Sequence, residues 1–243
     1  MKTNIYASIL SAKSKGQKQF AVLIDPDKMP NAEFLEKAVA AGVDYFFIGG
    51  SLLTNGNLTY CIDFVKKRTT IPVILFPGNI LQIDSSADAL LLLSLISGRN
   101  ADMLIGKHVI AAPLLKTSGL EVLPTGYMLI ESGNQTTVSY MSNTLPIPAD
   151  KDDIAMCTAM AGEMLGLKMI YMDAGSGAKN AISETMIKKV RSSISVPLII
   201  GGGINTAEGV QKACDSGADL VVIGTALEKD INLVDKLAKV FQN

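Results

Sequence analysis

The sequence predicts a single (βα)₈ barrel that spans residues 1–243. The length of 243 residues is close to the roughly 250 that are typical of this fold. Eight short apolar runs recur from one end of the chain to the other, and glycine-rich turns follow the last three of them. Hydrophobic residues make up 48% of the chain and charged residues 19%, a composition that argues against disorder.

The eight apolar runs are the candidate strands of the barrel. Most of them are continuous rather than alternating, which indicates strands buried on both faces, as in a parallel sheet. They lie at residues 21–25, 45–49, 72–76, 89–96, 126–130, 169–173, 197–201 and 220–224.

Amphipathic segments with recognisable ends lie between several of these strands. Asn31 can cap a helix that Gly42 ends, and Asn205 with Glu208 resembles a capping pair for a helix that stops at Gly217. A further apolar stripe near the end of the chain predicts one more helix, with Leu233, Val234, Leu237, Ala238 and Phe241 on one face.

A doubly wound sheet is the main alternative fold, but its glycine fingerprint usually follows the first strand. Here the glycine-rich turns follow the sixth, seventh and eighth strands, which favours the barrel. Residues 131–150 are rich in Ser, Thr, Asn and Pro, and they predict an irregular substrate loop after the fifth strand. Within that loop, residues 138–141 suggest a short extra strand.

Charge and cysteine usage exclude several classes of protein. The net charge is −1 and the basic residues are scattered, so no nucleic-acid footprint is present. Cys61, Cys157 and Cys214 lie far apart in apolar helical segments, which predicts buried free thiols rather than a metal site.

No basic segment followed by an apolar one comes after Met1, and the longest apolar run, residues 89–96, is far short of the ~20 residues that span a bilayer. The sequence therefore predicts a soluble cytoplasmic protein, and a brief contact with a membrane surface stays compatible with it.

Three successive strand ends carry small residues, at positions 173–177, 201–205 and 224–225. Glycine allows the backbone to approach a ligand closely and to adopt positive φ, so that N–H groups can converge on a phosphate. The loops after strands seven and eight form the recurrent phosphate site of (βα)₈ barrels. One such turn would be weak evidence, but three together predict a phosphorylated substrate.

Asp25 ends the first strand, where a carboxylate faces the mouth of a barrel. It could serve only an Asx turn, or it could be a ligand of Mg²⁺, which accepts one carboxylate plus substrate phosphates. Pro26 fixes the turn and Asp27 can cap it. Ser51, just after the second strand, supplies a neighbouring hydroxyl.

Asp173 and Tyr171 lie two residues apart on the sixth strand, so their side chains point to one face. Asp173 could take a proton from a substrate hydroxyl or could only bind that hydroxyl, and the sequence favours neither role. His108 is the only histidine; it lies among apolar residues, and no Ser or Cys nucleophile pairs with it in the sequence.

Several motifs together resemble the geranylgeranylglyceryl phosphate synthases, a family that includes the bacterial PcrB-type heptaprenylglyceryl phosphate synthases. The motifs are LIDPDK (23–28), FIGGS (47–51), LFPGN (75–79), LLLLSLISGRN (90–100), YMDAGSGA (171–178), GGGIN (201–205) and IGTAL (223–227). The resemblance runs from about residue 15 to the end of the chain.

The resemblance implies a Mg²⁺-dependent prenyltransferase with this barrel fold. Such an enzyme joins sn-glycerol 1-phosphate to a polyprenyl diphosphate through an ether bond and releases diphosphate. By position, Asp25 and Ser51 match the Mg²⁺ site, and Asp25 and Asp173 match catalytic positions. The residues that match the glycerol phosphate site are Tyr171, Met172, Asp173, Ala174, Gly175, Ser176, Gly177, Gly202, Gly203, Gly224 and Thr225.

Two positions depart from the family pattern. Asp173 stands where Glu is common, which sets the carboxylate back by one methylene, and Thr225 stands where many members have Asn. The pattern at residues 90–100 is similar to the group that includes Bacteroidetes and many archaeal members. That similarity implies a homo-oligomer, a hexamer or a dimer, and a C20 prenyl substrate, with C35 as the alternative.

Two other functions remain open from the residues alone. One is a different phosphate-binding barrel enzyme, such as an aldolase or isomerase, but the lysines near strand ends, such as Lys28 and Lys179, lie past the strands. The other is a non-catalytic lipid-binding or scaffold protein, against which Asp25 and the full set of glycine turns argue.

Overall fold

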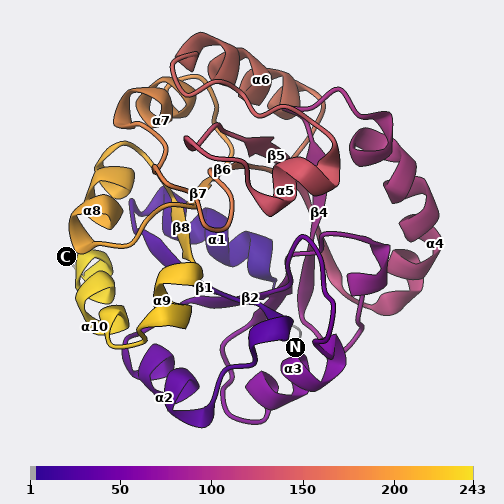
Figure 1. Cartoon of the computed structure of the whole chain (residues 1–243), viewed down its shortest axis with the longest axis vertical. Helices are drawn as coiled ribbons and strands as arrows, with labels where there is room; N and C mark the ends of the chain where they lie inside the picture. Colours follow the sequence, from indigo (N-terminus) through magenta and orange to yellow (C-terminus); the bar gives the residue numbers. More distant parts are fainter. Residues whose placement is uncertain (1–3, 243) are drawn as a thin grey trace.

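The computed structural model describes residues 4–242, which form a closed barrel of eight parallel strands in sequence order (Figure 1). Met1 and the outermost residues of the predicted 1–243 domain lie outside the described residues. The strands are β1 (Gln19–Ile24), β2 (Tyr45–Ile48), β3 (Val73–Leu75), β4 (Ala89–Leu95), β5 (Glu121–Leu129), β6 (Met169–Asp173), β7 (Leu198–Gly201) and β8 (Leu220–Ile223). The predicted fold is therefore confirmed.

The observed strand bounds agree with the predicted ones within one or two residues, except at β5. That strand begins at Glu121, five residues before the predicted start at residue 126. It pairs with the whole of β4, from the pair Ala89 and Glu121 to the pair Leu95 and Tyr127. The apolar run alone did not predict this extension because Glu121, Pro124 and Thr125 are not typical of a buried strand.

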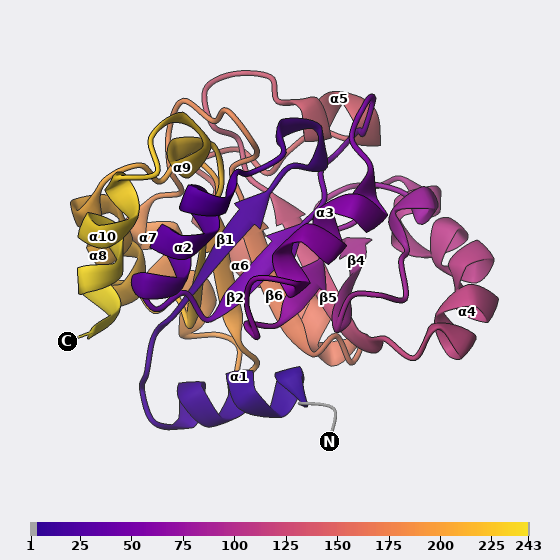
Figure 2. The same ribbon diagram turned by 90° about the horizontal axis from the view of Figure 1, so that it is seen from below.

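Most of the helices surround the barrel, whereas α5 and α9 lie over one end of it and α1 lies at the opposite end (Figures 1 and 2). They are α1 (Ile5–Ser14), α2 (Ala32–Ala40), α3 (Leu58–Lys66), α4 (Lys107–Ser118), α5 (Thr137–Ser142), α6 (Asp152–Met164), α7 (Glu184–Arg191), α8 (Ala207–Asp215), α9 (Thr225–Lys229) and α10 (Leu233–Ala238). Short helical turns are η1 (Pro26–Lys28), η2 (Ile80–Gln82), η3 (Asp102–Gly106, a π-helix) and η4 (Lys239–Gln242).

Helix α1 lies across the amino-terminal end of the barrel, opposite the loops that carry the site (Figure 2). Ile5 and Ile9 are buried in the core inside the barrel. The Glu121 carboxylate at the start of β5 accepts hydrogen bonds from the backbone N–H groups of Ile5, at 2.7 Å, and Tyr6, at 2.9 Å. A carboxylate at a helix N-terminus satisfies donors that have no partner within the helix. These bonds hold α1 against the amino-terminal end of the barrel, where it forms the floor of the barrel.

The predicted helix ends were right in one case and wrong in another. The Asn31 side chain accepts a hydrogen bond from Phe34 N and caps α2, as predicted. Thr206, and not Asn205, caps α8 by accepting from Gly209 N at 3.1 Å. Two adjacent residues with capping side chains cannot be separated by composition alone.

Two further expectations are corrected. Residues 138–141 belong to α5 rather than to an extra strand; the polar loop between β5 and α6 is instead tied down by an isolated bridge between Ile130 and Ile147. Cys61 and Cys214 are buried free thiols as predicted, whereas Cys157 is exposed on α6.

One crossover has no α-helix. The chain passes from β3 to β4 through η2 alone, whereas each of the other crossovers contains at least one α-helix. The outer layer of the barrel is therefore thin beside β4, where η2 and α4 are the neighbouring elements. The pocket of the candidate site extends into this part of the barrel.

Two hydrophobic cores stabilise the barrel, one inside it and one between the strands and the surrounding helices. Inward-facing side chains fill its interior, including Phe47, Leu91 and Tyr171, and outward-facing ones pack against the helices. Among the described residues, none of the helices combines the length and the apolar character needed to cross a membrane.

Candidate active site at the carboxyl ends of the strands

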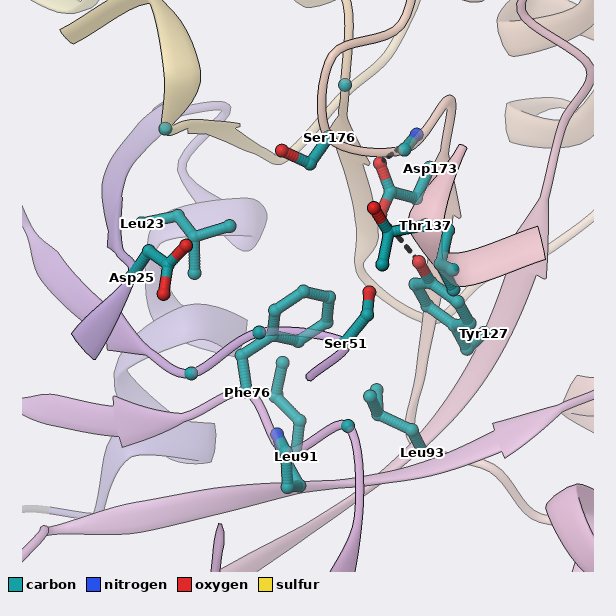
Figure 3. A pocket seen from close by; sticks show the side chains of 18 of the residues that line it. Leu23, Asp25, Ser51, Phe76, Leu91, Leu93, Tyr127, Thr137, Asp173 and Ser176 are labelled. Atoms are coloured by element: carbon teal, nitrogen blue, oxygen red, sulfur yellow. Dashed lines mark hydrogen bonds between the residues drawn. The ribbon is translucent and has the colours of Figure 1, made fainter. Parts of the chain in front are cut away.

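A pocket of about 460 Å³ opens at the carboxyl ends of the strands. Residues that follow β1, β2, β6, β7 and β8 meet around it, as Figure 3 shows for Asp25, Ser51, Asp173 and Ser176. This is the position at which (βα)₈ barrels place their active sites. The structure thus brings residues far apart in the sequence into one cavity, as the pattern of strand ends predicted.

The three glycine-rich turns lie side by side on one wall of the pocket. The Ser176 hydroxyl, after β6, lies 3.1 Å from the Thr225 hydroxyl, after β8. Gly202 and Gly203 adopt φ of +79° and +72°. A Cβ on Gly202 would lie 2.6 Å from Gly175 N, so only glycine fits between these turns.

Backbone N–H groups on this wall are free to bind an anion. Within residues 4–242, the N–H groups of Gly203, Gly224 and Thr225 donate to no carbonyl or side-chain acceptor of the protein. Backbone donors without a protein partner on one pocket wall can form an anion site without a charged side chain. The wall has the chemistry of a phosphate site.

Two of the predicted substrate-binding residues do not reach the pocket. Met172 and Ala174 are buried in the outer core, between the strands and the helices, because alternate residues of a strand point to opposite faces. Tyr171 and Asp173, which point inward, line the pocket together with Gly175, Ser176 and Gly177. The side chains of Met172 and Ala174 therefore pack in the outer core, and only their backbone groups could serve the predicted site.

Asp173 is buried at the base of the phosphate wall and held from two sides. Its Oδ2 accepts a hydrogen bond from the Tyr127 hydroxyl at 2.6 Å, and its Oδ1 accepts from Gly175 N at 2.8 Å (Figure 3). Burial raises the pKa of Asp173 above its ordinary value, and these two hydrogen bonds oppose that rise. A buried carboxylate with a raised pKa in a cleft is a candidate acid–base group.

Asp25 and Ser51 also line this pocket, at separate positions: Asp25 lies opposite Asp173 in Figure 3, and Ser51 lies between them in that view. Asp25 Oδ1 accepts a hydrogen bond from Asp27 N at 3.0 Å, which makes it the cap of η1, and Oδ2 lies 3.7 Å from Lys28 Nζ. A Cβ on Gly50 would lie 3.8 Å from Asp25 Oδ1, so the turn that carries Ser51 runs close to the carboxylate. The turn after β2 therefore passes beside Asp25 at Gly50, while a joint role of Asp25 and Ser51 stays a prediction.

The Asp27 side chain anchors the loop after β2, and Asp25, not Asp27, caps η1. Its carboxylate accepts hydrogen bonds from the backbone N–H groups of Thr54, Asn55 and Gly56 in the loop after β2. These bonds lower the pKa of Asp27 to about 2, led by those from Thr54 and Asn55. The folded-state pKa lies below the ordinary one, so this anchor is complete above about pH 4 and is lost as the pH falls through about 2.

The pocket has an apolar extension, as a prenyl substrate requires, but no single stretch of the sequence identified the residues that line it. The extension passes over β4 and under α4, in the space where the crossover after β3 has no α-helix. Both faces of β4 take part, since Leu91 and Leu93 point into the barrel and Leu90 and Leu92 point out of it. The residues that line the extension are Ile80, Ile83, Leu90, Leu91, Leu92, Leu93, Leu95, Met103, Ala111 and Leu115.

His108 lines this apolar extension, and it has a hydroxyl neighbour that the sequence did not reveal. Its Nε2 lies 3.3 Å from Ser94 Oγ. Burial lowers the pKa of His108, which favours the neutral ring. No carboxylate is recorded against the ring within the described residues, so the pair lacks the third group that orients a catalytic triad.

The site therefore has a glycine-rich wall for a phosphate, a buried carboxylate beside it, a second carboxylate across the pocket and an apolar extension. This combination defines a (βα)₈ enzyme of the phosphate-binding class. The chain belongs to the PcrB family, whose model matches residues 13–241.

Known relatives share the whole barrel with this chain. A geranylgeranylglyceryl phosphate synthase of Chitinophaga pinensis is 55% identical over 241 residues, which cover 98% of this chain and 96% of the relative. A synthase of the same name from Spirosoma linguale is 56% identical over 231 residues, 94% and 93% of the two chains.

A solved structure agrees with the barrel throughout. The (S)-3-O-geranylgeranylglyceryl phosphate synthase of Thermoplasma acidophilum, in complex with its substrate sn-glycerol-1-phosphate, superposes with a TM-score of 0.90 at 30% identity. The match covers 99% of this chain and 98% of that one.

Proposed function

We propose that this protein is a prenyltransferase that joins sn-glycerol 1-phosphate to geranylgeranyl diphosphate and forms an ether-linked geranylgeranylglyceryl phosphate. The observation that carries the proposal is the pocket itself, in which a phosphate wall, Asp173 and an apolar extension line one cavity. The relatives from Chitinophaga and Spirosoma bear the name of this activity, and the Thermoplasma enzyme binds sn-glycerol-1-phosphate as its substrate.

Glycerol 1-phosphate fits the wall formed by the turns after β6, β7 and β8. The free N–H groups of Gly203, Gly224 and Thr225 would bind its phosphate. Its hydroxyl would then lie near Asp173 at the base of the wall. Holding the hydroxyl in place beside the second substrate supplies much of the rate, because the reaction needs two molecules to meet in one orientation.

The prenyl chain fits the apolar extension under α4. The tail of a C20 diphosphate is apolar along its whole length, and the extension presents ten apolar side chains from η2, β4, η3 and α4 and from the turn after η2. Removal of this surface from water on binding stabilises the complex by ~25 cal/mol per Å². The diphosphate would then lie at the mouth, between the tail and Asp25.

Asp25 and Ser51 would hold Mg²⁺. The donor set fits, because Mg²⁺ in proteins is commonly held by one or two carboxylates together with substrate phosphates and water. Among the described residues no cluster of three or more acidic, His or Cys side chains forms a closed metal cage, which agrees with a site that the substrate completes. Bound Mg²⁺ would neutralise negative charge on the diphosphate leaving group.

The chemical step forms one bond and breaks another. The glycerol hydroxyl oxygen bonds to the allylic C1 of the prenyl chain, the C1–O bond to diphosphate breaks, and the diphosphate leaves with the electron pair. Asp173 accepts the hydroxyl proton as the general base. Its raised pKa brings its basicity closer to neutral pH than that of an ordinary aspartate.

Incubation with sn-glycerol 1-phosphate, Mg²⁺ and prenyl diphosphates from C15 to C35, followed by mass spectrometry, tests the activity. We expect an ether product with the C20 substrate turned over fastest. A faster C35 reaction would assign the heptaprenyl activity instead, and no ether product from any chain length would refute the proposed function.

Asp25→Asn tests the metal role separately. We expect turnover to be lost at limiting Mg²⁺ while calorimetry still shows binding of glycerol 1-phosphate, because the groups proposed to bind its phosphate are the backbone N–H groups of Gly203, Gly224 and Thr225 and not the Asp25 carboxylate. Near-normal activity of this variant at limiting Mg²⁺ would show that Asp25 is not a metal ligand.

A further inference from the structure

Tyr127 is a buried tyrosine that touches the proposed base directly. It lies on β5, next to β6, and its hydroxyl donates to Asp173 Oδ2 at 2.6 Å (Figure 3). The strand register pairs Tyr127 with Tyr171 and Leu129 with Asp173, so Tyr127 points inward one step below the carboxylate. No motif in the sequence singled it out.

The tyrosine ring is fixed from two other sides. Its centroid lies 5.5 Å from that of Tyr171 and 5.9 Å from that of Phe76, in edge-to-face contacts. These contacts would be equally available to phenylalanine, so they explain the ring but not the hydroxyl. The hydroxyl has its recorded partner in Asp173, as a buried Tyr O–H needs one.

The hydrogen bonds leave Asp173 with one defined orientation. Tyr127 holds Oδ2 and Gly175 N holds Oδ1. An ionised carboxylate has about four acceptor positions, so two stay open after these bonds are made. With both oxygens held in place, the carboxylate cannot rotate away from a hydroxyl bound in the pocket.

We infer that Tyr127 is a positioning residue for the ether-forming reaction, which orients the Asp173 carboxylate and favours its ionised form. The inference rests on the proposed function, in which Asp173 is the base. Tyr127 itself does not take part in the proton transfer.

The groups around Tyr127 and Asp173 indicate which of the two side chains carries the shared proton. Burial raises the pKa of Tyr127 well above its ordinary value, and the neighbouring Asp173 carboxylate raises it further, so the phenol is the donor. Within the described residues, the titratable groups that face Asp173 are Tyr127 on β5 and Tyr171 on β6, and β7 presents Gly201 and Gly202. Loss of the Tyr127 hydroxyl would remove a bond that lowers the pKa of Asp173 and would thus raise that pKa.

Tyr127→Phe tests the inference through the pH dependence of turnover. We expect the acid limb of the kcat profile to move to higher pH and kcat at the wild-type acid midpoint to fall by roughly 10- to 100-fold, the effect of one hydrogen bond to a charged group. The KM for glycerol 1-phosphate should change little. An unmoved acid limb, with or without a loss of kcat, overturns the inference.

Tyr45→Phe is the matched control. Tyr45 is also a buried tyrosine of the inner core, but its hydroxyl bonds Gln19 and Ser8 near the floor of the barrel. This variant loses a comparable hydroxyl without touching Asp173, so we expect a wild-type pH profile. A shift as large as that of Tyr127→Phe would mean that general loosening of the core moves the profile, and would overturn the inference.

A second variant covers the case in which Tyr127→Phe does not fold. Fluorotyrosine at position 127 keeps the shape and donates more strongly because its phenol is more acidic, so the acid limb should move to lower pH. A movement in the other direction, or none, contradicts the inference.

A measurement without turnover separates this inference from the proposed function. Asp173 can be titrated by NMR in protein labelled with ¹³C-Asp, its signal assigned by its loss in Asp173→Asn. The signal should titrate at higher pH in Tyr127→Phe than in the wild type, even if no prenyl substrate is turned over. Equal titration in both proteins overturns the inference, whereas absence of ether product with a shifted signal refutes only the proposed reaction.

Discussion

Asp173 offers a direct test of general-base catalysis at the residue scale. Asp173→Asn keeps the shape of the side chain but removes the base. We expect kcat to fall by ~10²–10⁴, the range for one general base, while the affinity for glycerol 1-phosphate changes little. Steady-state kinetics with calorimetric binding would measure both quantities.

The opposite result would assign Asp173 a binding role. If it only holds the substrate hydroxyl, the affinity should fall by ~1.5–3 kcal/mol, the effect of a hydrogen bond to a charged group, while kcat at saturation survives. Asp173→Glu adds one methylene, and a rise in kcat would show that the shorter arm limits the reaction. An Asn variant with unchanged kcat and affinity would leave Asp173 as a structural residue of the turn.

Single residues at strand ends were predictable from alternation and glycine content, but their partners were not. The two-residue spacing of Tyr171 and Asp173 correctly predicted a shared inward face. The same alternation places the side chains of Met172 and Ala174 in the outer core, although the family motif includes both residues in the predicted site. The bond from Tyr127 to Asp173 joins positions 46 residues apart, and only the closure of the barrel brings them together.

At the scale of elements, the turn after β7 depends on a glycine that has no room for a side chain. Gly202→Ala would place a Cβ 2.6 Å from Gly175 N and 2.7 Å from Asp173 Oδ1, at a φ of +79°. We expect a lower melting temperature and loss of glycerol 1-phosphate binding, because the turns after β6 and β7 must move apart. Thermal unfolding and calorimetry measure the two effects.

Gly166→Ala is the matched control for this turn. Gly166 also has a positive φ, +86°, but nothing lies within 4 Å of the added Cβ. It should cost only the ~1–2 kcal/mol of a left-handed alanine and leave substrate binding intact. Equal effects of the two substitutions on binding would mean that the contact between the turns does not shape the phosphate site.

Sequence periodicity predicted where most elements lie and failed where local chemistry was ambiguous. Thr206 and Asn205 are both good caps, and the tertiary structure decided between them. Residues 138–141 have the β-branched and aromatic character of a strand, yet the capping box of Thr136 with Ser139 begins a helix there. The absence of an α-helix after β3 left no positive signal, so the position of the apolar extension that depends on it could not be predicted.

At the scale of the whole molecule, an exposed aliphatic face on η3 and α4 bears on self-association. Its residues are Ile105, Val109, Ile110 and Leu114, each more than half exposed. Their positions, one and four residues apart, place them on one side of this helical segment, and exposed apolar surface of this kind marks interaction sites in soluble proteins. We propose that a second copy of the chain covers it, in line with the oligomer that the family resemblance implies.

Ile110→Glu should therefore lower the oligomeric state measured by light scattering after size-exclusion chromatography, because it places a charge within an apolar contact. Leu10→Glu, at an exposed position on α1 under the floor of the barrel, should leave the mass unchanged. A wild-type protein that elutes as a monomer at micromolar concentration would refute the proposal.

The eight-stranded barrel itself was the most predictable property of the chain. Continuous apolar runs indicated parallel strands buried on both sides, and the position of the glycine turns favoured the barrel over the doubly wound alternative, as the closed barrel confirms. The apolar runs repeat eight times along the chain, whereas the site depends on single contacts between distant segments.

The floor made by α1 also governs which nucleophile can reach the prenyl group. Ile5 and Ile9 are only 1% exposed and belong to the core inside the barrel, so among the described residues α1 covers this end of the barrel against bulk water. A water molecule that intercepts the allylic carbon would have to enter at the mouth, in competition with glycerol phosphate. The proportion of free prenyl alcohol among the products is then a gauge of how completely the polar substrate seals the mouth, and it should decline as that substrate approaches saturation.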